Sequence, residues 1–503
     1  MLGIFLIPIN TAFAQTDAGR IVGTVTDVNG AVVPNATVVV KNDRTGEERT
    51  VTTSEEGIYL VPALKASFYS VSVTAQGLEA KADNLQVSVG QELNLNLTLQ
   101  PSGVATSVDV VASSEAALDT GSARIGANVN EREVEGLPIN GRQLSQLYLQ
   151  APGSVNTGSG TFADIRFSGR ANQQNVVRYD GVEGTAIIDS SPGNLNGEVP
   201  TPFRLQSSLE NVQEFRVDSS NYPAEYGTGT GGQINVVTKS GGNDFHGSLF
   251  EYLRNDALDA RNFFDVVGKS PLRLNQFGGS LGGPIVKDKF FFFGSYEGYR
   301  LRSGINNVEA VPSAAACARA VAATQPFCLA AFRSPDAVVL PGASTSADFD
   351  ILQLQSSNTV DENAFSGRLD LKFNTNNSMF FRFFRDKGTN NSPEGVTGRR
   401  TVIEAVPQNA VLEYQSIISP SVINEAKIGY NGARTRINGF APTVNGVDLS
   451  AVILNISGQV ANSGIPGQGG NSGIAVPGGL VRANSATNGR GQPYTPYSLG
   501  FID

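Results

Sequence analysis

The chain has 503 residues, of which 17% are charged, with a net charge of −9 and an isoelectric point near 5.0. An acidic chain without a basic stripe is poorly suited to phosphate backbones, so nucleic acid is excluded as a partner. Glycine (56 residues), phenylalanine (27) and tyrosine (13) are abundant. No apolar run reaches the roughly 18 residues that a membrane helix needs. Length and composition together favour a mainly β protein with several domains.

The first residues have the pattern of a signal peptide. A short apolar stretch from Met1 leads to Ala12-Phe13-Ala14, the small-x-small sequence of a signal-peptidase site. The positive charges that usually precede the apolar stretch are missing. A buried first strand is the alternative, which Pro8 disfavours. We therefore expect residues 1–15 to be removed on export.

Residues 20–99 have the pattern of a small β-sandwich. Short alternating segments are separated by turn sequences such as Asp27-Val-Asn-Gly30, and about seven strands in about eighty residues are typical of an immunoglobulin-like sandwich. The phrases Gly23-Thr-Val-Thr-Asp27 and Tyr69-Ser-Val-Ser-Val-Thr-Ala75 resemble the carboxypeptidase-regulatory-like domain, which implies a carbohydrate-binding-like fold. No exposed aromatic pair supports sugar binding, so a spacer or docking role is expected.

Residues 100–119 are expected to form a linker. Its β-prone segment lies just before the next domain, and this position resembles that of a TonB box. The candidate residues are Val108, Asp109, Val110 and Val111. The resemblance implies a TonB-type energy-transducing protein as partner, which would bind the segment by β-strand addition. An additional strand of the sandwich is the alternative.

Residues 120–240 change to a mixed α/β pattern. Arg142 to Leu149 has apolar residues at helical spacing, and strands are expected around Ile165 and Val176. The order Arg-x-x-Gly, Asp-Gly-Val and Tyr-Gly…Gly-Gly-x-Ile-Asn-x-x-Thr-Lys resembles the plug of TonB-dependent receptors. The residues that carry this resemblance are Arg166, Asp180, Gly181, Tyr226, Gly227, Gly231, Gly232 and Asn235. We expect the glycines to let the plug backbone lie against a barrel wall, with a hinge at Gly241-Gly242.

Residues 241–503 have the pattern of a transmembrane β-barrel. From Phe365 to Phe373 the residues alternate between apolar and polar, with Arg368 on the polar face, as strands of about ten residues in a lipid-facing barrel require. In the next strand Met379, Phe381 and Phe383 share one face, with Arg382 among the residues between them. The expected strands are Phe245–Arg254, Arg273–Ile285, Lys289–Leu301, Asn363–Phe373, Ser378–Asp386, Asn409–Ile418 and Val422–Thr435. Short joins alternate with long ones, of which Asn255–Leu272, Arg302–Glu362 and Lys387–Gln408 are the long ones.

The first strands of this region carry a further resemblance. Leu274-Asn-Gln-Phe-Gly278 and the run of four phenylalanines from Phe290 are similar to the Oar-like branch of the TonB-dependent family. Plugged transporter barrels have about 22 strands, so we expect an incomplete barrel and the N-terminal part of a longer product.

Cysteine and histidine are too few for a convincing metal site or catalytic centre. Cys317 and Cys328 are the only cysteines, and in an exported chain they are expected to form a disulfide, with two free buried thiols as the alternative. His246 is the only histidine and lies in an expected barrel strand. No catalytic residue, metal site or cofactor is therefore predicted.

The resemblance as a whole implies a TonB-dependent transporter of the cell outer membrane, with its sandwich in the periplasm. Its expected partners are a TonB-type protein, outer-membrane lipid and an unidentified small solute, such as a carbohydrate, a chelated metal or a peptide. An outer-membrane adhesion or surface-organising protein that keeps the plugged barrel but transports nothing is the alternative.

Overall fold

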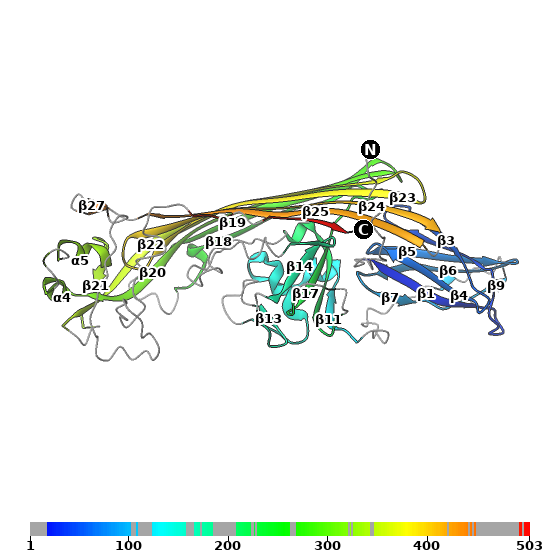
Figure 1. Ribbon diagram of the computed structural model, residues 1–503, viewed down its shortest axis with the longest axis horizontal. Helices are drawn as coiled ribbons and strands as arrows, with labels where there is room; N and C mark the ends of the chain where they lie inside the picture. The colour runs from blue at the N-terminus through cyan, green and yellow to red at the C-terminus, as the bar shows by residue number, and fades with distance from the viewer. Residues whose placement is uncertain are drawn as a thin grey trace, which may run out of the picture.

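The computed structural model describes the chain in three units that follow one another along the sequence. The described residues are 18–101, 107–108, 123–156, 165–171, 174–184, 208–222, 226, 229–261, 268–319, 322, 325–342, 347–419, 422–440, 443–444, 447–448, 492–494 and 497–502. The expected signal peptide, residues 1–15, lies outside them. A small sandwich and a mixed unit lie along one face of a long curved sheet (Figure 1). We call these units the sandwich (19–101), the plug (123–240) and the wall (246–440).

No helix in the described ranges is both long enough and apolar enough to cross a membrane.

The sandwich consists of two sheets. One has the order β4-β1-β7 with β8 beside β1, and the other has the order β10-β6-β5-β2-β3 with β9 beside β6. The strands are β1 (Gly19–Thr26), β2 (Thr37–Asn42), β3 (Glu48–Thr52), β4 (Ile58–Leu64), β5 (Ser67–Ala75), β6 (Leu78–Val87), β7 (Glu92–Asn94), β8 (Leu97–Thr98), β9 (Gln100–Pro101) and β10 (Ser107–Val108). Alternate residues of both sheets, such as Ile21, Val38 and Val71, are fully buried between them.

The plug is built on a five-stranded sheet with the order β11-β16-β17-β14-β15. Its strands are β11 (Ile125–Val129), β14 (Val176–Tyr179), β15 (Val182–Glu183), β16 (Val212–Ser220) and β17 (Gln233–Thr238), and β12 (Ser154–Asn156) pairs with β13 (Ile165–Phe167) beside it. Short helices are α1 (Glu131–Gly136), η1 (Asn140–Arg142), η2 (Leu144–Gln150) and η5 (Leu209–Asn211).

Two helices of the plug differ from the sequence prediction. The segment expected to be an α-helix from Arg142 is the 3-10 helix η2, whose Leu144 and Leu147 share one buried face because they are three residues apart. Helix α1 was not predicted. Asn130 caps it and Glu133 returns the bond to the Asn130 backbone, so an Asn-x-x-Glu signature was present in the sequence.

The wall is one antiparallel sheet in which consecutive strands are neighbours. It comprises β18 (His246–Asn255), β19 (Leu272–Val286), β20 (Phe290–Pro312), β22 (Phe349–Lys372), β23 (Asn377–Glu394), β24 (Arg399–Ser419) and β25 (Val422–Phe440), with β28 (Gln492–Tyr494) and β29 (Tyr497–Ile502) beside β25 and β21 (Val338–Val339) beside β22. A small hairpin of β26 (Thr443–Val444) and β27 (Val447–Asp448) stands apart. The mainly β fold class is confirmed, and the described part of the wall is an open sheet rather than a closed barrel.

The wall strands are longer than the sequence analysis predicted. Strand β23 continues to Glu394 and β24 begins at Arg399, so most of the expected loop Lys387–Gln408 is strand. The expected loop Arg302–Glu362 is shortened in the same way by β20 and β22. The prediction ended each strand where its apolar alternation ended. A β ladder is made of backbone hydrogen bonds, however, and continues through polar residues.

The two faces of the wall differ in polarity as predicted. Phe365, Leu369 and Phe381 are exposed on one face, whereas Arg368 and Arg382 are buried on the other. The exposed apolar face is the one that lipid would cover, and the polar face is turned toward the plug.

The two ends of the wall also differ. Short turns join β19 to β20, β22 to β23 and β24 to β25 at one end, which we call the turn end. Two longer connections, β18 to β19 and β20 to β22, lie at the loop end, where α4 (Ala314–Ala318) and α5 (Gln325–Phe332) pack on β20 and β22 (Figure 1). The join between β23 and β24 at this end is as short as the turns, so the predicted alternation of short and long joins is wrong there. Cys317 and Cys328 form a disulfide between these helices, with Cα atoms 5.6 Å apart, which is the pairing expected from the sequence.

Candidate functional site

The centre of the contact between plug and wall is a buried turn. Asp180 and Gly181 are the two central residues of the hairpin that joins β14 to β15, and both have positive φ, 50° and 82°. Asp-Gly suits such a turn because glycine adopts this conformation without strain and aspartate tolerates it. A polar turn is normally at the surface, yet only 5% of Asp180 is exposed. Its carboxylate therefore needs partners.

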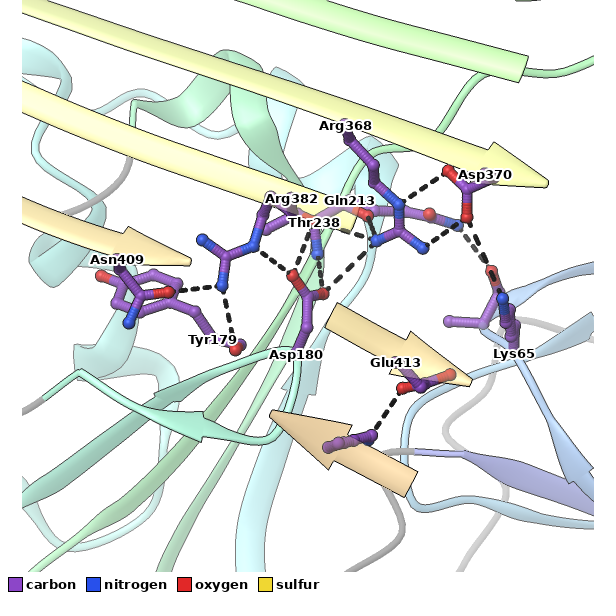
Figure 2. Close-up of polar contacts among 12 residues, drawn as sticks. Lys65, Tyr179, Asp180, Gln213, Thr238, Arg368, Asp370, Arg382, Asn409 and Glu413 are labelled. Atoms are coloured by element: carbon purple, nitrogen blue, oxygen red, sulfur yellow. Dashed lines mark hydrogen bonds and ion pairs between the residues drawn. The ribbon is translucent and has the colours of Figure 1, made fainter. Parts of the chain in front are cut away.

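The partners of Asp180 come from both the plug and the wall (Figure 2). Arg382 donates from Nε to Oδ2 over 2.6 Å, and Arg368 Nη1 lies 3.5 Å from Oδ1. The backbone N–H and the hydroxyl of Thr238 each donate over 2.9 Å. Burial alone would raise the pKa of this carboxyl, but the two guanidinium groups and the Thr238 bonds outweigh it and hold the pKa below its usual range. We call Asp180, Thr238, Arg368 and Arg382 the Asp180 cluster.

The two arginines of the cluster are direct cross-strand partners. Arg368 on β22 is paired with Arg382 on β23, and both side chains are buried. Like charges directly opposite each other destabilise a sheet. Asp180 supplies a negative charge between them, and Asp370 accepts two further bonds of 2.9 Å from Arg368. The wall thus carries a local excess of positive charge that the plug neutralises.

Further bonds spread this contact over neighbouring strands. Arg382 also donates to the Tyr179 carbonyl over 3.2 Å and to Asn409 Oδ1 on β24 over 2.5 Å. Arg368 donates to the Thr238 carbonyl over 3.2 Å. The ends of β14 and β17 are therefore fastened to β22 and β23, and Asn409 of β24 holds Arg382 in place.

An apolar contact lies beside the cluster. Val182 of the plug is buried against Phe380 and Val411 of the wall. Gly429 on β25 makes room for it, because a Cβ at this position would lie 2.5 Å from a Val182 methyl group. The close approach of plug and wall thus depends on a glycine of the wall.

The glycines of the plug motif serve another purpose than predicted. A Cβ at Gly232 would lie 2.4 Å from the ring of Phe167, and a Cβ at Gly231 would meet Asn175. Both neighbours belong to the plug itself, so the expected contact of these two glycines with the barrel wall is wrong. Gly241 does approach the wall, because its Cβ would lie 2.3 Å from the Phe292 carbonyl oxygen.

The remaining motif residues are divided between two places. Asn235 donates to the Tyr226 hydroxyl over 3.0 Å, and the guanidinium of Arg178 lies 5.2 Å from the Tyr226 ring centre. Arg166 is exposed on β13, apart from the Asp180 cluster. Gly227 lies outside the described residues.

The candidate TonB box is described only at its start. Ser107 and Val108 pair in parallel with Lys81 and Ala82 of β6, at the edge of the sandwich. Asp109, Val110 and Val111 lie outside the described residues. The assignment of this segment as a TonB box stays a prediction.

Sequence analysis placed Arg368 and Arg382 on the polar face of their strands but did not identify them as site residues. Thr238 is the threonine of the motif Gly-Gly-x-Ile-Asn-x-x-Thr-Lys, but its contact with Asp180 was not predicted, and Asn409 was not singled out. Within the described ranges, no group of three or more His, Cys, Asp or Glu residues is arranged to hold a metal ion.

A plug whose buried carboxylate is fastened to the polar face of a long β wall defines the class of plugged outer-membrane barrel proteins. The outer membrane beta barrel domain family matches residues 237–499, and the carboxypeptidase regulatory-like domain family matches residues 20–100. The first match covers more than half of the chain. The chain belongs to the outer membrane beta barrel domain family, and its place is the outer membrane.

Two curated relatives extend this assignment. The TonB-dependent transporter Oar of Myxococcus xanthus is 29% identical over 305 residues, which cover 57% of this chain and 27% of the relative. The probable TonB-dependent siderophore receptor PirA of Acinetobacter baumannii is 26% identical over 194 residues, 36% of this chain and 23% of that protein. The chain is thus a relative of TonB-dependent transporters with an N-terminal regulatory-like domain, and it spans about a quarter of the length of these relatives.

The similarity to two solved structures is lower. The outer membrane transporter YddB of Escherichia coli has 12% identity and a TM-score of 0.41, over 63% of this chain and 39% of that one. The siderophore receptor PirA of Acinetobacter baumannii has 15% identity and a TM-score of 0.35, over 62% and 45%.

Proposed function

We propose that the protein is a TonB-dependent receptor that takes up a small solute across the outer membrane. The observation that supports this most directly is the Asp180 cluster. It fastens the plug to the wall by hydrogen bonds and ion pairs only, 2.6 Å at Arg382 and 3.5 Å at Arg368. Such a contact is firm at rest and can be broken without breaking a covalent bond.

Opening this contact needs work. Separating a buried ion pair without replacing its partners costs on the order of 3–5 kcal/mol, which thermal motion supplies rarely. A TonB-type protein that binds Val108 to Val111 by strand addition would supply this work from the linker. One curated relative is a TonB-dependent transporter and the other a probable TonB-dependent siderophore receptor, which supports a TonB-type partner. The second relative also supports a solute of the chelated-metal class, and carbohydrate and peptide are the other candidates.

The test is a deletion of Val108 to Val111. Cells that express the protein are offered labelled ferric enterobactin, maltodextrin or a defined peptide mixture, and surface display is measured by antibody binding. We expect uptake of one probe to fall to the level of cells without a TonB-type protein, while display is unchanged. Normal display with no uptake of any probe by the undeleted protein would contradict the proposal and favour a non-transporting surface protein.

A further inference from the structure

The sandwich contacts both the plug and the wall, whereas a simple spacer would need no such contacts. The sandwich lies at the turn end of the wall, and the plug lies between it and the loop end (Figure 1). Contacts join the sandwich to both other units. The sandwich therefore closes the side of the plug that faces the turn end.

Three loops of the sandwich bind the plug. Gln213 Nε2 donates to the Ala66 carbonyl over 2.7 Å, and the Val89 N–H donates to the carboxylate of Glu214. Gln213 and Glu214 lie at the start of β16 and are 7% and 3% exposed. Arg44 forms an ion pair of 2.6 Å with Glu131 at the start of α1. The plug strand β16 cannot move away from the sandwich while these bonds remain.

The same face of the sandwich binds the wall. Arg49 donates to Gln415 Oε1 over 2.9 Å, and the Asn243 N–H donates to the Arg44 carbonyl over 2.9 Å. Lys65 lies 5.2 Å from the ring centre of Phe380 and 3.9 Å from Asp370.

Lys65 links the sandwich to the Asp180 cluster. Asp370 binds Arg368, and Arg368 contacts Asp180, so a continuous row of charges runs from the sandwich to the plug turn (Figure 2). The charge that neutralises Arg368 is thus partly shared with Lys65. Removing the sandwich changes the electrostatics of the plug contact as well as its steric support.

The interface is of the kind that separates without unfolding. The apolar core of the sandwich and that of the plug are two distinct clusters of buried residues in the described ranges. The contacts of the sandwich described above are hydrogen bonds, ion pairs and the approach of Lys65 to the Phe380 ring. A pocket remains where the three units meet, lined by Arg44, Lys65, Gln213, Ser240 and Phe291 among others. Polar interfaces between domains resemble transient protein–protein contacts. Undocking would therefore leave both cores intact.

We propose that the docked sandwich is an autoinhibitory cap, which holds the plug on the wall and must leave this face before the plug rearranges. The proposal rests on the proposed function in one respect: it takes the plug to be the part that moves to let the solute pass. The linker adds a route for release: Ser107 and Val108 pair with β6, so a partner that pulls on Val108 acts on the sandwich before it acts on the plug.

A reversible crosslink tests the cap. A Cβ at Gly242 would lie 3.7 Å from the Cβ of Arg44, which is the separation of a disulfide. In the double variant Arg44→Cys/Gly242→Cys the sandwich is locked when oxidised and able to undock when reduced. Both forms lack the Arg44–Glu131 ion pair, so they differ only in the crosslink. Amide hydrogen exchange of β16 and β17 is measured in both forms of the purified protein. We expect exchange to be about tenfold slower in the locked form, as for a suppressed opening.

Charge reversal gives an independent arm. Lys65→Glu places a carboxylate beside Asp370 and should undock the sandwich, so exchange in β16 becomes faster. Lys41→Glu is the matched control, because Lys41 pairs with Glu48 within the sandwich and is exposed. Wild-type protein with reductant controls for reduction of the Cys317–Cys328 disulfide.

The outcomes separate the two proposals. Hydrogen exchange needs neither solute nor TonB-type protein, so equal exchange in the locked and reduced forms overturns the cap whatever uptake does. Uptake that is blocked by oxidation and restored by reductant supports the cap within a working receptor. Slower exchange in the locked form without uptake by any variant leaves the cap standing and overturns the proposed function alone.

Discussion

The substitution Asp180→Asn probes the contact between plug and wall with almost no change in shape. The wild-type carboxylate accepts bonds from Arg382 Nε and from both donors of Thr238, and it also faces Arg368. An amide has one accepting oxygen and one donating NH2 group. Whichever way it turns, the NH2 group points at donors. The variant also leaves two buried arginines directly opposite each other with less negative charge between them.

The expected cost follows from burial. Asp180, Arg368 and Arg382 are 5%, 6% and 2% exposed, so water cannot replace the lost partner. Removing one member of a buried ion pair costs about 3–5 kcal/mol. The amide keeps one acceptor, which favours the lower value, and about 3 kcal/mol corresponds to roughly a hundredfold increase in the open population of the plug.

Hydrogen exchange of β14 and β17 measures this change, because these strands end at the cluster. Asp361→Asn is the matched control. Asp361 also accepts a 2.8 Å bond from an arginine, Arg302, but its side chain is 42% exposed, and such pairs contribute about 0–1 kcal/mol. If Asp180→Asn exchanges no faster than Asp361→Asn, the cluster does not hold the plug and the reasoning is refuted.

Three further predictions concern the interface, the wall and the orientation. Burial raises the pKa of Glu214 to about 7, against the Val89 and Ser88 bonds that lower it. Because the carboxyl keeps its proton longer when the sandwich is docked, docking is strongest below the ordinary pKa of 4.5 and weakens as pH rises from there to about 7. Sandwich–plug crosslinking should therefore fall over that range in wild type but not in Glu214→Gln. Gly429→Val should disturb seating of the plug hairpin and speed exchange in β14, whereas Gly268→Val, which would have open space around its Cβ, should not. Barrels of this class have short periplasmic turns and longer extracellular loops, so we expect the loop end to face outside. In intact cells, a membrane-impermeant thiol reagent should label Val338→Cys at the loop end but not Asn376→Cys at the turn end. Equal labelling of both would remove the assigned orientation, and labelling of Asn376→Cys alone would reverse it.

The sequence was sufficient to predict the wall because its two faces meet different surroundings. Alternation placed Arg368 and Arg382 on the polar face, and each lies four residues from the last ladder pair before the turn, Lys372 and Ser378. That symmetry was a signal that they would lie opposite each other. Asp180, the partner of both arginines, could not be predicted. It contacts them only because of how the plug lies on the wall, and the alternation of residues along a strand does not specify that arrangement.

Glycines and strand ends show the same limit. Gly232 was recognised as a position that needs close approach, but the neighbour that approaches is Phe167 of the plug and not the wall. A sequence shows where a side chain is missing but not what fills the space. Strand β23 runs on to Glu394 because hydrogen bonding to its neighbours does not depend on which face is apolar.

The opposed arginines of the wall have a consequence for biogenesis. A wall that assembled without its plug would keep Arg368 and Arg382 face to face across β22 and β23, with Asp370 as the nearby carboxylate bound to only one of them. Such an empty wall is the less stable product because like charges then oppose each other across a sheet. Strands β22 and β23 thus pair most stably when the plug is already in place. Assembly then disfavours an unplugged wall, which would be a hole in the permeability barrier.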